Sequence, residues 1–131
     1  IYYLAKSFYD IEKPEYDEVA QQLMMRFIGD SSSEEERAEA WKYVGDIFKR
    51  GDDFDQAIKS SANGLIDNPQ NPWLYLSLAD SYLNKKDYTK AKFWVNLSEH
   101  IQDNDPFLAK NPRNFISEKD RITTQIKNNC N

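Results

Sequence analysis

Two acidic pairs are the residues of this sequence whose spacing most resembles a chemical motif. Asp53-Phe54-Asp55 and Asp103-Asn104-Asp105 have the Asp-x-Asp pattern with which many sugar transferases hold a metal ion and a nucleotide. The first pair lies in a polar turn, however, and its central Phe54 suits a core position. The second lies in a loop that ends a helix. We therefore interpret both pairs as turn residues.

His100 and Cys130 are the only histidine and cysteine of the chain. A metal site of the usual kind needs more such ligands, and a histidine near a helix C-terminus can cap backbone carbonyls. Cys130 lies one residue from the last position, without ordered surroundings that would activate a thiolate. The four glycines are too scattered for a phosphate loop, and no serine lies in a nucleophile elbow. We predict no catalytic residue, metal or cofactor within residues 1–131.

Length and composition indicate one folded domain. The chain has 131 residues, of which 40% are hydrophobic and 14% aromatic, enough for a core of its own. Its net charge of −5 argues against a nucleic-acid or anionic-membrane binder. No apolar run approaches the roughly 18–20 residues of a membrane span. The single cysteine excludes an internal disulfide, so we expect a cytoplasmic protein.

The first residues already follow a helical pattern. Ile1-Tyr2-Tyr3-Leu4-Ala5 opens without an initiator methionine and inside an amphipathic segment. We therefore expect that this sequence is a piece of a longer polypeptide.

The sequence contains an internal repeat, which predicts the helices on which any functional surface would lie. Two segments match at an offset of 34 residues, with small residues where two helices would cross and aromatic residues beside the crossing. Polar Asp-containing turns join the helices at the same offset. The matched positions are Trp41 and Tyr75, Gly45 and Ala79, Phe48 and Tyr82, Phe54 and Tyr88, and Ala57 and Ala91.

A weaker copy of the same pattern comes first in the chain. Leu4, Ala5 and Phe8 match Val44, Gly45 and Phe48, and Tyr16 with Val19 matches Phe54 with Ala57. Pro14 suits the first turn of a helix and forbids an uninterrupted one.

The repeat predicts helices and domain limits. We expect helix pairs at 1–11 with 15–29, 34–50 with 54–67, and 71–85 with 88–102. The serines at 31–33 should cap the third of these helices. Loops are expected at 103–106 and 111–114, then a final helix from Ser117 that presents Ile122 and Ile126. Residues 127–131 should fray. The repeats would occupy 1–103 (about 1–30, 34–69 and 71–103), and the loop with its capping helix 104–131.

This 34-residue pattern resembles the tetratricopeptide repeat: a large residue, a small one, an aromatic, then alanine and proline. The resemblance implies an all-α, right-handed superhelix of three helix–turn–helix repeats plus a C-terminal capping helix. In such a stack the first helix of each pair lines the concave face. The residues expected there for partner binding are Tyr2, Lys6, Tyr9, Lys42, Asp46, Lys49, Trp73, Leu76, Asp80 and Leu83.

One tetratricopeptide subclass, which clamps the C-terminal carboxylate of chaperones, does not fit. That clamp needs Lys and Asn on the concave helices. The matching places here hold Asp46, Asp80, Tyr43 and Ser77, which would repel or ignore a carboxylate.

A second resemblance covers nearly the whole chain. The order of its motifs is similar to the helical-repeat region that follows the catalytic domain in some bacterial and phage-type family 2 glycosyltransferases. The motifs are Tyr3-Leu4-Ala5, Ser7-Phe8-Tyr9-Asp10, Arg26, Glu34-Glu35-Glu36-Arg37, Ala57, Leu78-Ala79, the segment 91–94 and Asn111-Pro112-Arg113-Asn114-Phe115.

Two functional hypotheses follow. In the first, the chain is a non-catalytic binding or scaffolding module of a larger glycosyltransferase-like protein, where it docks a protein or an acceptor substrate or mediates self-association. The alternative is a stand-alone adaptor that recruits a protein or peptide through its concave face. Neither hypothesis involves nucleic acid or a membrane.

Overall fold

A computed structural model describes residues 1–102 and 112–129. Within these ranges the chain forms seven α-helices and no strand, which confirms the all-α class. None of the described helices combines the length and apolar character that crossing a membrane requires. The helices are α1 (Tyr2–Ile11), α2 (Pro14–Asp30), α3 (Glu34–Arg50), α4 (Phe54–Asp67), α5 (Pro72–Asn84), α6 (Tyr88–Gln102) and α8 (Pro112–Asn129).

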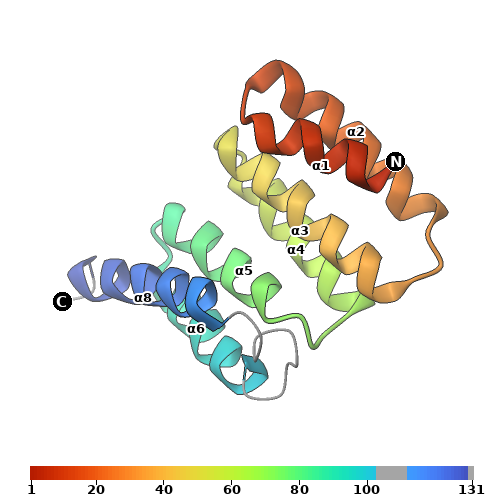
Figure 1. Cartoon of the computed structure of the whole chain (residues 1–131). Coiled ribbons are helices and arrows are strands. Elements are labelled where there is room, and N and C mark those ends of the chain that lie inside the picture. The colour runs from red at the N-terminus through yellow and green to blue at the C-terminus, as the bar shows by residue number, and fades with distance from the viewer. Residues whose placement is uncertain (103–111, 130–131) are drawn as a thin grey trace.

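Neighbouring helices pack as hairpins that lie side by side in chain order. α1 packs on α2, α3 on α4 and α5 on α6, and each hairpin contacts the next through α2 with α3 and α4 with α5. α8 contacts both α5 and α6 at the end of the row (Figure 1). The first six helices agree with the predicted ranges to within one residue at each end.

The turn inside the second hairpin is reproduced in the third. Asp52 and Lys86, which are 34 residues apart, both adopt left-handed backbone with φ of 60° and 65°. The next residue in each turn, Asp53 or Asp87, donates its N–H to a carbonyl five positions earlier, at 2.9 Å in both cases. These bonds close the preceding helix in the manner of a Schellman motif. The sequence repeat is therefore also a repeat of backbone conformation.

Helix starts follow the predicted polar residues. The Ser33 hydroxyl accepts the Glu36 N–H at 3.2 Å, and the Asp53 carboxylate accepts the Gln56 N–H at 3.2 Å. Each bond satisfies one N–H that the first turn of a helix leaves without a partner. Asp53 of the first Asp-x-Asp pair is thus a helix cap. The second pair lies outside the described residues.

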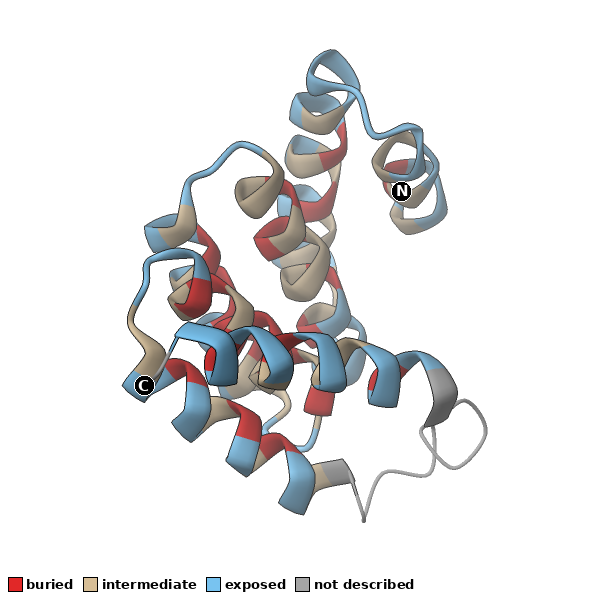
Figure 2. Cartoon of the chain, turned by 90° about the vertical axis from the view of Figure 1, so that its left-hand side faces the viewer, coloured by how far each residue is buried: buried red, intermediate tan, exposed pale blue. Residues whose placement is uncertain are grey.

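The core is divided between the hairpins. Ala5, Met24, Ala40 and Val44 pack between the first and second hairpins. A larger cluster joins α5, α6 and α8 through Leu76, Ala79, Leu83, Ala91, Val95, Phe115, Ile122 and Ile126. Buried residues lie on the helix faces that turn toward one another (Figure 2).

Glycine permits the closest approach between hairpins. A Cβ placed on Gly64 of α4 would lie 2.9 Å from both terminal methyl groups of Leu74 and 3.1 Å from the Trp41 Cβ. Leu74 is fully buried, so its side chain has little room to move. Gly64 therefore sets the distance at which α3, α4 and α5 meet.

The first hairpin differs from the predicted match. Val19 was expected to take the buried place of Ala57, but it is 37% exposed and its neighbour Ala20 is fully buried. Leu4 is 54% exposed, whereas its match Val44 is buried. Val44 packs with Met24 of the preceding hairpin, and no described helix covers Leu4 in the same way.

The final helix is longer than predicted. α8 begins at Pro112 rather than Ser117, so residues 112–114 are helical and not a loop. Proline favours the first helical position, where an N–H would have no partner and its φ fits the helix. The helix also continues through Lys127 to Asn129, which were expected to fray. The predicted loop at 103–106, Asn111, and Cys130 with Asn131 lie outside the described residues.

Replacing Gly64 with leucine should destabilise the fold. The added side chain collides with Leu74 and Trp41, so we expect the free energy of unfolding to fall by about 2 kcal/mol or more. Chemical denaturation followed by circular dichroism measures the change. Gly29→Leu is the matched control, because nothing lies within 4 Å of a Cβ there. Equal effects of the two substitutions would contradict the packing argument.

Replacing Lys86 with glycine should stabilise the fold. The left-handed conformation at this position costs a residue with a Cβ about 1 kcal/mol, and glycine avoids that cost. Lys86→Ala keeps the Cβ and removes the same charge, so it should give no gain. Thermal unfolding of the two variants separates backbone strain from charge. A higher melting temperature for Lys86→Ala than for Lys86→Gly would contradict the prediction.

Candidate functional site

α8 covers the face of α5 that was predicted to be concave and open. Leu76 and Leu83 are only 2% and 8% exposed, and they pack in one cluster with Phe115, Ile122 and Ile126. Leu83 therefore does not lie in an open groove, and Leu76, although almost fully buried, lies at the edge of a recess beside α3. They belong to the core because α8 lies over the helix face that was expected to be free.

Trp73 is also less accessible than predicted. It is half-buried, and its ring meets Phe115 of α8 edge to face with centroids 5.4 Å apart. Its remaining exposed part lines a recess shared with α3.

The 34-residue offset shows why the corresponding face of the second hairpin stays open. Lys42 and Lys49 of α3 match Leu76 and Leu83 of α5, and Glu39 matches Trp73. The side chains are polar where the face is open and apolar where α8 covers it. This exchange of polar for apolar residues is visible in the sequence, and it could have indicated that another helix covers this face of α5.

A network of charges crosses the open face and joins four helices. Asp46 of α3 lies 3.1 Å from the Lys42 ammonium and 3.4 Å from that of Lys49, and it accepts the Tyr9 hydroxyl of α1 at 2.9 Å. Lys49 also reaches Asp80 of α5 at 3.2 Å. The network continues into α8.

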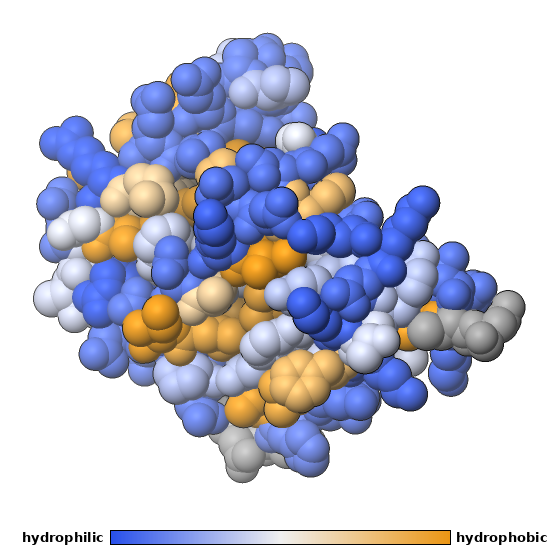
Figure 3. Space-filling view, turned by 180° about the vertical axis from the view of Figure 1, so that it is seen from behind, coloured by the Kyte–Doolittle hydropathy of each residue, from blue (hydrophilic) through white to orange (hydrophobic). Residues whose placement is uncertain are grey.

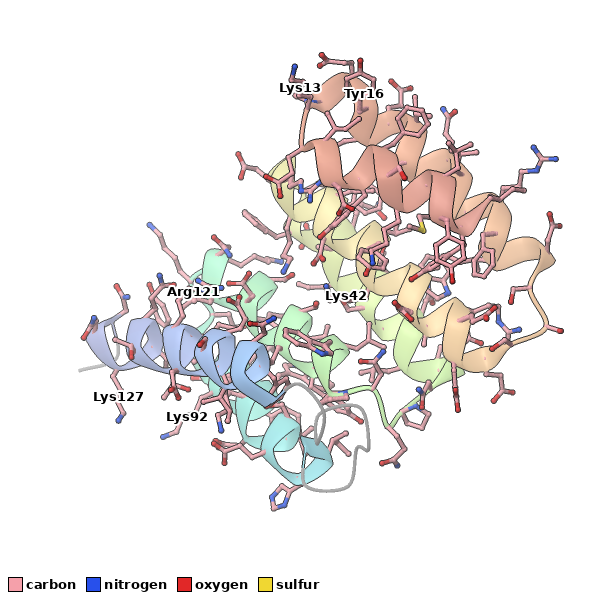
Figure 4. All side chains as sticks on the ribbon, viewed as in Figure 1. Lys13, Tyr16, Lys42, Lys92, Arg121 and Lys127 are labelled. Atoms are coloured by element: carbon pink, nitrogen blue, oxygen red, sulfur yellow. The ribbon has the colours of Figure 1, made fainter. Side chains whose placement is uncertain are left out.

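Arg121 of α8 completes this network. Its guanidinium lies 3.0 Å from Asp80 and 2.5 Å from Glu118 of its own helix. Figure 4 shows Arg121 on the side of α8 that faces α5, and Lys42 on the side of α3 that faces α5. Five of the predicted concave residues thus meet in one network, namely Tyr9, Lys42, Asp46, Lys49 and Asp80.

The central pair of the network is held in its charged form. Burial alone would raise the pKa of Asp46, but Lys42 and Lys49 and the hydrogen bond from Tyr9 bring it below its ordinary value. Burial likewise opposes the charge on Lys49, yet Asp46 and Asp80 raise its pKa above the ordinary value. The attraction between these groups therefore outweighs their loss of water.

The first hairpin is joined to α3 by tyrosine hydroxyls and an arginine. Tyr2 donates its hydroxyl to Glu39 at 2.7 Å, and burial together with that carboxylate raises the Tyr2 pKa. Burial and Asp46 raise the pKa of Tyr9 in the same direction. Arg50 lies 3.9 Å from the centroid of the Tyr9 ring and pairs with Asp17 of α2 at 2.9 Å.

Lys6 of α1 and Lys42 of α3 both lie near the ring of Tyr43. The Lys6 ammonium lies 6.0 Å from the ring centroid and that of Lys42 lies 5.0 Å from it. Lys42 is also 5.5 Å from the Trp73 ring, which extends the polar surface toward α5. These are cation–π distances, each worth about 0.5–1 kcal/mol at exposed sites.

Two hollows lie along this network. The first has a volume of about 290 Å³ and lies between α3, α5 and the start of α8. We call it the α3–α8 recess. The second, of about 510 Å³, is shallower and lies over α1, α3 and α5. Residues lining the α3–α8 recess are Lys42, Asp46, Lys49, Trp73, Leu76, Ser77, Asn114 and Glu118.

Sequence reasoning missed the part of the recess that α8 contributes. Asn114 and Glu118 stand four residues apart on one face of that helix and line the recess opposite Lys42. They were not predicted because Asn114 was assigned to a loop and binding residues were expected only on the first helix of each pair.

The lining of the α3–α8 recess combines paired charges with an aromatic ring. Its charged side chains largely face opposite charges of the chain, while Trp73 offers apolar surface. No group of His, Cys, Asp and Glu among the described residues has the arrangement of a metal site. Asp55, the other member of the first Asp-x-Asp pair, forms an ion pair with Lys85, the residue that follows α5.

Apolar side chains are also exposed on the opposite side of the molecule. Seen from behind, they gather over α4 and α6 (Figure 3). Ile66 is 81% exposed and Phe93 56% exposed. Neither side chain lines the two hollows described above.

We compared the sequence with models of protein families and with curated proteins. No model of a protein family matches this sequence, and no curated protein matches it.

Replacing Asp46 with asparagine tests the network. Lys42, Lys49 and Tyr9 lose a shared carboxylate, so we expect the free energy of unfolding at neutral pH to fall by about 2–3 kcal/mol. The Asp46 pKa is lowered by folding, so its contribution is present above the unfolded value of about 3.9 and is lost as the pH falls through the lower folded value.

The difference between the wild type and Asp46→Asn should therefore shrink below about pH 4. Urea unfolding at a series of pH values measures it. Asp10→Asn, at an exposed position of α1, serves as the control and should change stability little at any pH. A difference that is constant from neutral to acidic pH would contradict the assignment of the charge on Asp46.

Proposed function

We propose that the chain is a non-catalytic, tetratricopeptide-like binding module that holds a partner polypeptide on its concave side. The proposed architecture is a right-handed superhelix of three helix–turn–helix repeats closed by α8. The 34-residue sequence offset and the matching turns at Asp52 and Lys86 support it. The side-by-side order of the hairpins is compatible with such a stack.

One observation carries the proposal: the α3–α8 recess combines apolar surface with charged groups of both signs. The half-buried ring of Trp73 can receive an apolar side chain of a bound segment. Lys42 and Glu118 can exchange part of their contacts within the chain for contacts with that segment. Aromatic anchors next to charged groups are typical of peptide-binding surfaces.

The second hollow would extend this surface toward the first hairpin. It is lined by Tyr9, Arg50, Asp80 and Arg121, among others, and shares Asp46 and Lys49 with the recess. A bound segment that runs along both hollows would cross α8, α3 and α1. We propose an extended peptide as the ligand, because the two hollows adjoin along the charge network.

The larger setting that we propose is a glycosyltransferase-like protein. The resemblance to the repeat region of family 2 glycosyltransferases supports it, and the module would then dock an acceptor substrate or a protein partner for a catalytic domain elsewhere. Several residues that carry the resemblance, such as Ala57, Leu78 and Ala79, are buried packing residues. Because buried packing residues do not contact a ligand, they support a shared fold more than a shared ligand. The alternative is a stand-alone adaptor that uses the same recess.

Peptide selection on the intact chain tests the proposed binding. Peptides selected from a random displayed library would be measured for affinity against the wild type and against Asn114→Trp, which fills the recess from an exposed position. We expect this variant and Lys42→Glu to lose about tenfold or more in affinity, which is about 1.4 kcal/mol. Lys92→Glu, on exposed α6 surface (Figure 4), should bind as the wild type does.

Selected peptides that bind all three variants equally would place binding elsewhere and contradict the proposal. Circular dichroism of each variant excludes loss of folding as the cause. The setting is tested separately, by the length of the natural polypeptide. An α/β domain with an Asp-x-Asp motif in that polypeptide would support the glycosyltransferase setting, and a polypeptide without one would favour the adaptor.

A further inference from the structure

Two contacts between α5 and α8 fix how these helices lie beside the α3–α8 recess. Trp73 meets Phe115 edge to face, and Asp80 pairs with Arg121 further along the same two helices. The residue numbers rise together from the first contact to the second, so α5 and α8 run in the same direction, as Figure 1 also shows. Residues between the two contacts on α5 are therefore level with residues between them on α8.

The recess accordingly has an apolar end and a polar end. The ring of Trp73 forms the apolar end, and Ser77 of α5 with Glu118 of α8 forms the polar end between the two contacts. Ser77 follows Trp73 by four residues, which corresponds to about 6 Å along the helix axis. That separation is close to the length of two residues in an extended peptide, which is about 6.6 Å.

The hydroxyl of Ser77 is available to a polar group that enters the recess. Ser77 lines the recess although it is only 5% exposed. Among the described residues its hydroxyl forms no hydrogen bond, whereas the Ser81 hydroxyl, one turn later, donates to the Ser77 carbonyl at 2.9 Å. Nearly buried hydroxyls usually have a partner, so a ligand atom that supplies one gains free energy at this position.

The charged side chains of the recess accept a cation more readily than an anion. Glu118 is the most exposed of them, at 38%, and its partner is Arg121 of the same helix. Such an exposed pair contributes little, and Arg121 would keep Asp80, so Glu118 can turn to a cation of a ligand at small cost.

The lysines of the recess are bound more firmly. Lys42 holds Asp46, whose side chain is only 14% exposed, and Lys49 is shared between Asp46 and Asp80. An anion that drew either lysine away would leave a largely buried carboxylate with one partner fewer, which costs more than the exposed contact gains. This asymmetry favours a basic group over an acidic one at the polar end.

We infer that the α3–α8 recess selects an extended peptide in which one residue separates a large apolar residue from a lysine or arginine. This inference rests on the proposed binding of a peptide at the recess. Residues two apart in an extended segment point to the same side, so both side chains reach the recess together. The apolar side chain lies on the exposed part of the Trp73 ring. The basic group pairs with Glu118 and donates a hydrogen bond to the Ser77 hydroxyl.

Parallel selections from a random displayed peptide library test this preference. They use the intact wild type, Glu118→Lys and Asp120→Lys, which makes the same change of charge at an exposed position of α8 that does not line the recess. We expect the wild type and Asp120→Lys to select Lys or Arg two positions from the apolar residue. Glu118→Lys should select Asp or Glu at that position, because it reverses the charge of the polar end.

Synthetic copies of the peptides selected by the wild type measure the size of the effect. Replacing their Lys or Arg with Glu should weaken binding to the wild type about tenfold or more and strengthen binding to Glu118→Lys. Ser77→Ala should weaken binding of the basic peptides about fivefold. Ser81→Ala is its control, because the Ser81 hydroxyl is already engaged within α5, and it should bind as the wild type does. Circular dichroism establishes that each variant folds.

The outcomes separate this inference from the proposed function. Peptides that lose binding to Asn114→Trp but show no preference for a basic residue overturn the inference and leave the proposed function in place. A basic preference that Glu118→Lys leaves unchanged does the same. Equal effects of Ser77→Ala and Ser81→Ala overturn the hydrogen bond assigned to Ser77. If Asn114→Trp binds every selected peptide as the wild type does, the proposed function fails and the inference fails with it.

Discussion

The close approach of consecutive hairpins is the constraint on which the other features depend. Gly64 has no side chain, so α4 can lie against Leu74 of α5 and Trp41 of α3 at once. That distance brings α3 and α5 near enough for the Lys49 ammonium to reach Asp46 and Asp80 together. Larger side chains at the crossing would separate the two carboxylates, and one lysine could no longer bridge them. A steric property of the core thus sets the electrostatics of the face that α3 and α5 share.

The position of α8 divides that face into a closed and an open part. Over α5 the helix excludes water, and apolar Leu76 and Leu83 meet Phe115, Ile122 and Ile126. Over α3 the matching residues are Lys42 and Lys49, which remain within reach of solvent. Arg121 lies at the boundary and extends the charge network from α5 to α8. The recess exists because a covered hairpin adjoins an uncovered one.

The helices could be predicted well because helix caps and turns are determined by residues that are close together in the sequence. The caps at Ser33 and Asp53 and the turns that contain Asp52 and Lys86 depend on a few neighbouring residues. The start of α8 was misjudged because Asn111-Pro112 was interpreted as a loop, although proline also favours the first turn of a helix. The final helix was predicted to cap the third hairpin, and Ile122 and Ile126 do pack there. That it also covers Leu76 and Leu83 depends on contacts far apart in sequence, which only the exchange of Lys42 and Lys49 for these leucines indicated.

The paired charges restrict what the recess can bind. A strongly acidic segment that recruits Lys42 and Lys49 would have to compete with Asp46 and Asp80, which already hold them at salt-bridge distances. Releasing a carboxylate that is largely buried would leave it without a partner, which costs more than an exposed pair gains. A segment with few charges avoids this competition, since it can place an apolar side chain against Trp73 and direct its backbone polar groups to Asn114. In the proposed binding, the network would therefore favour apolar or mixed-charge partners over polyanions, through the same contacts that hold the hairpins together.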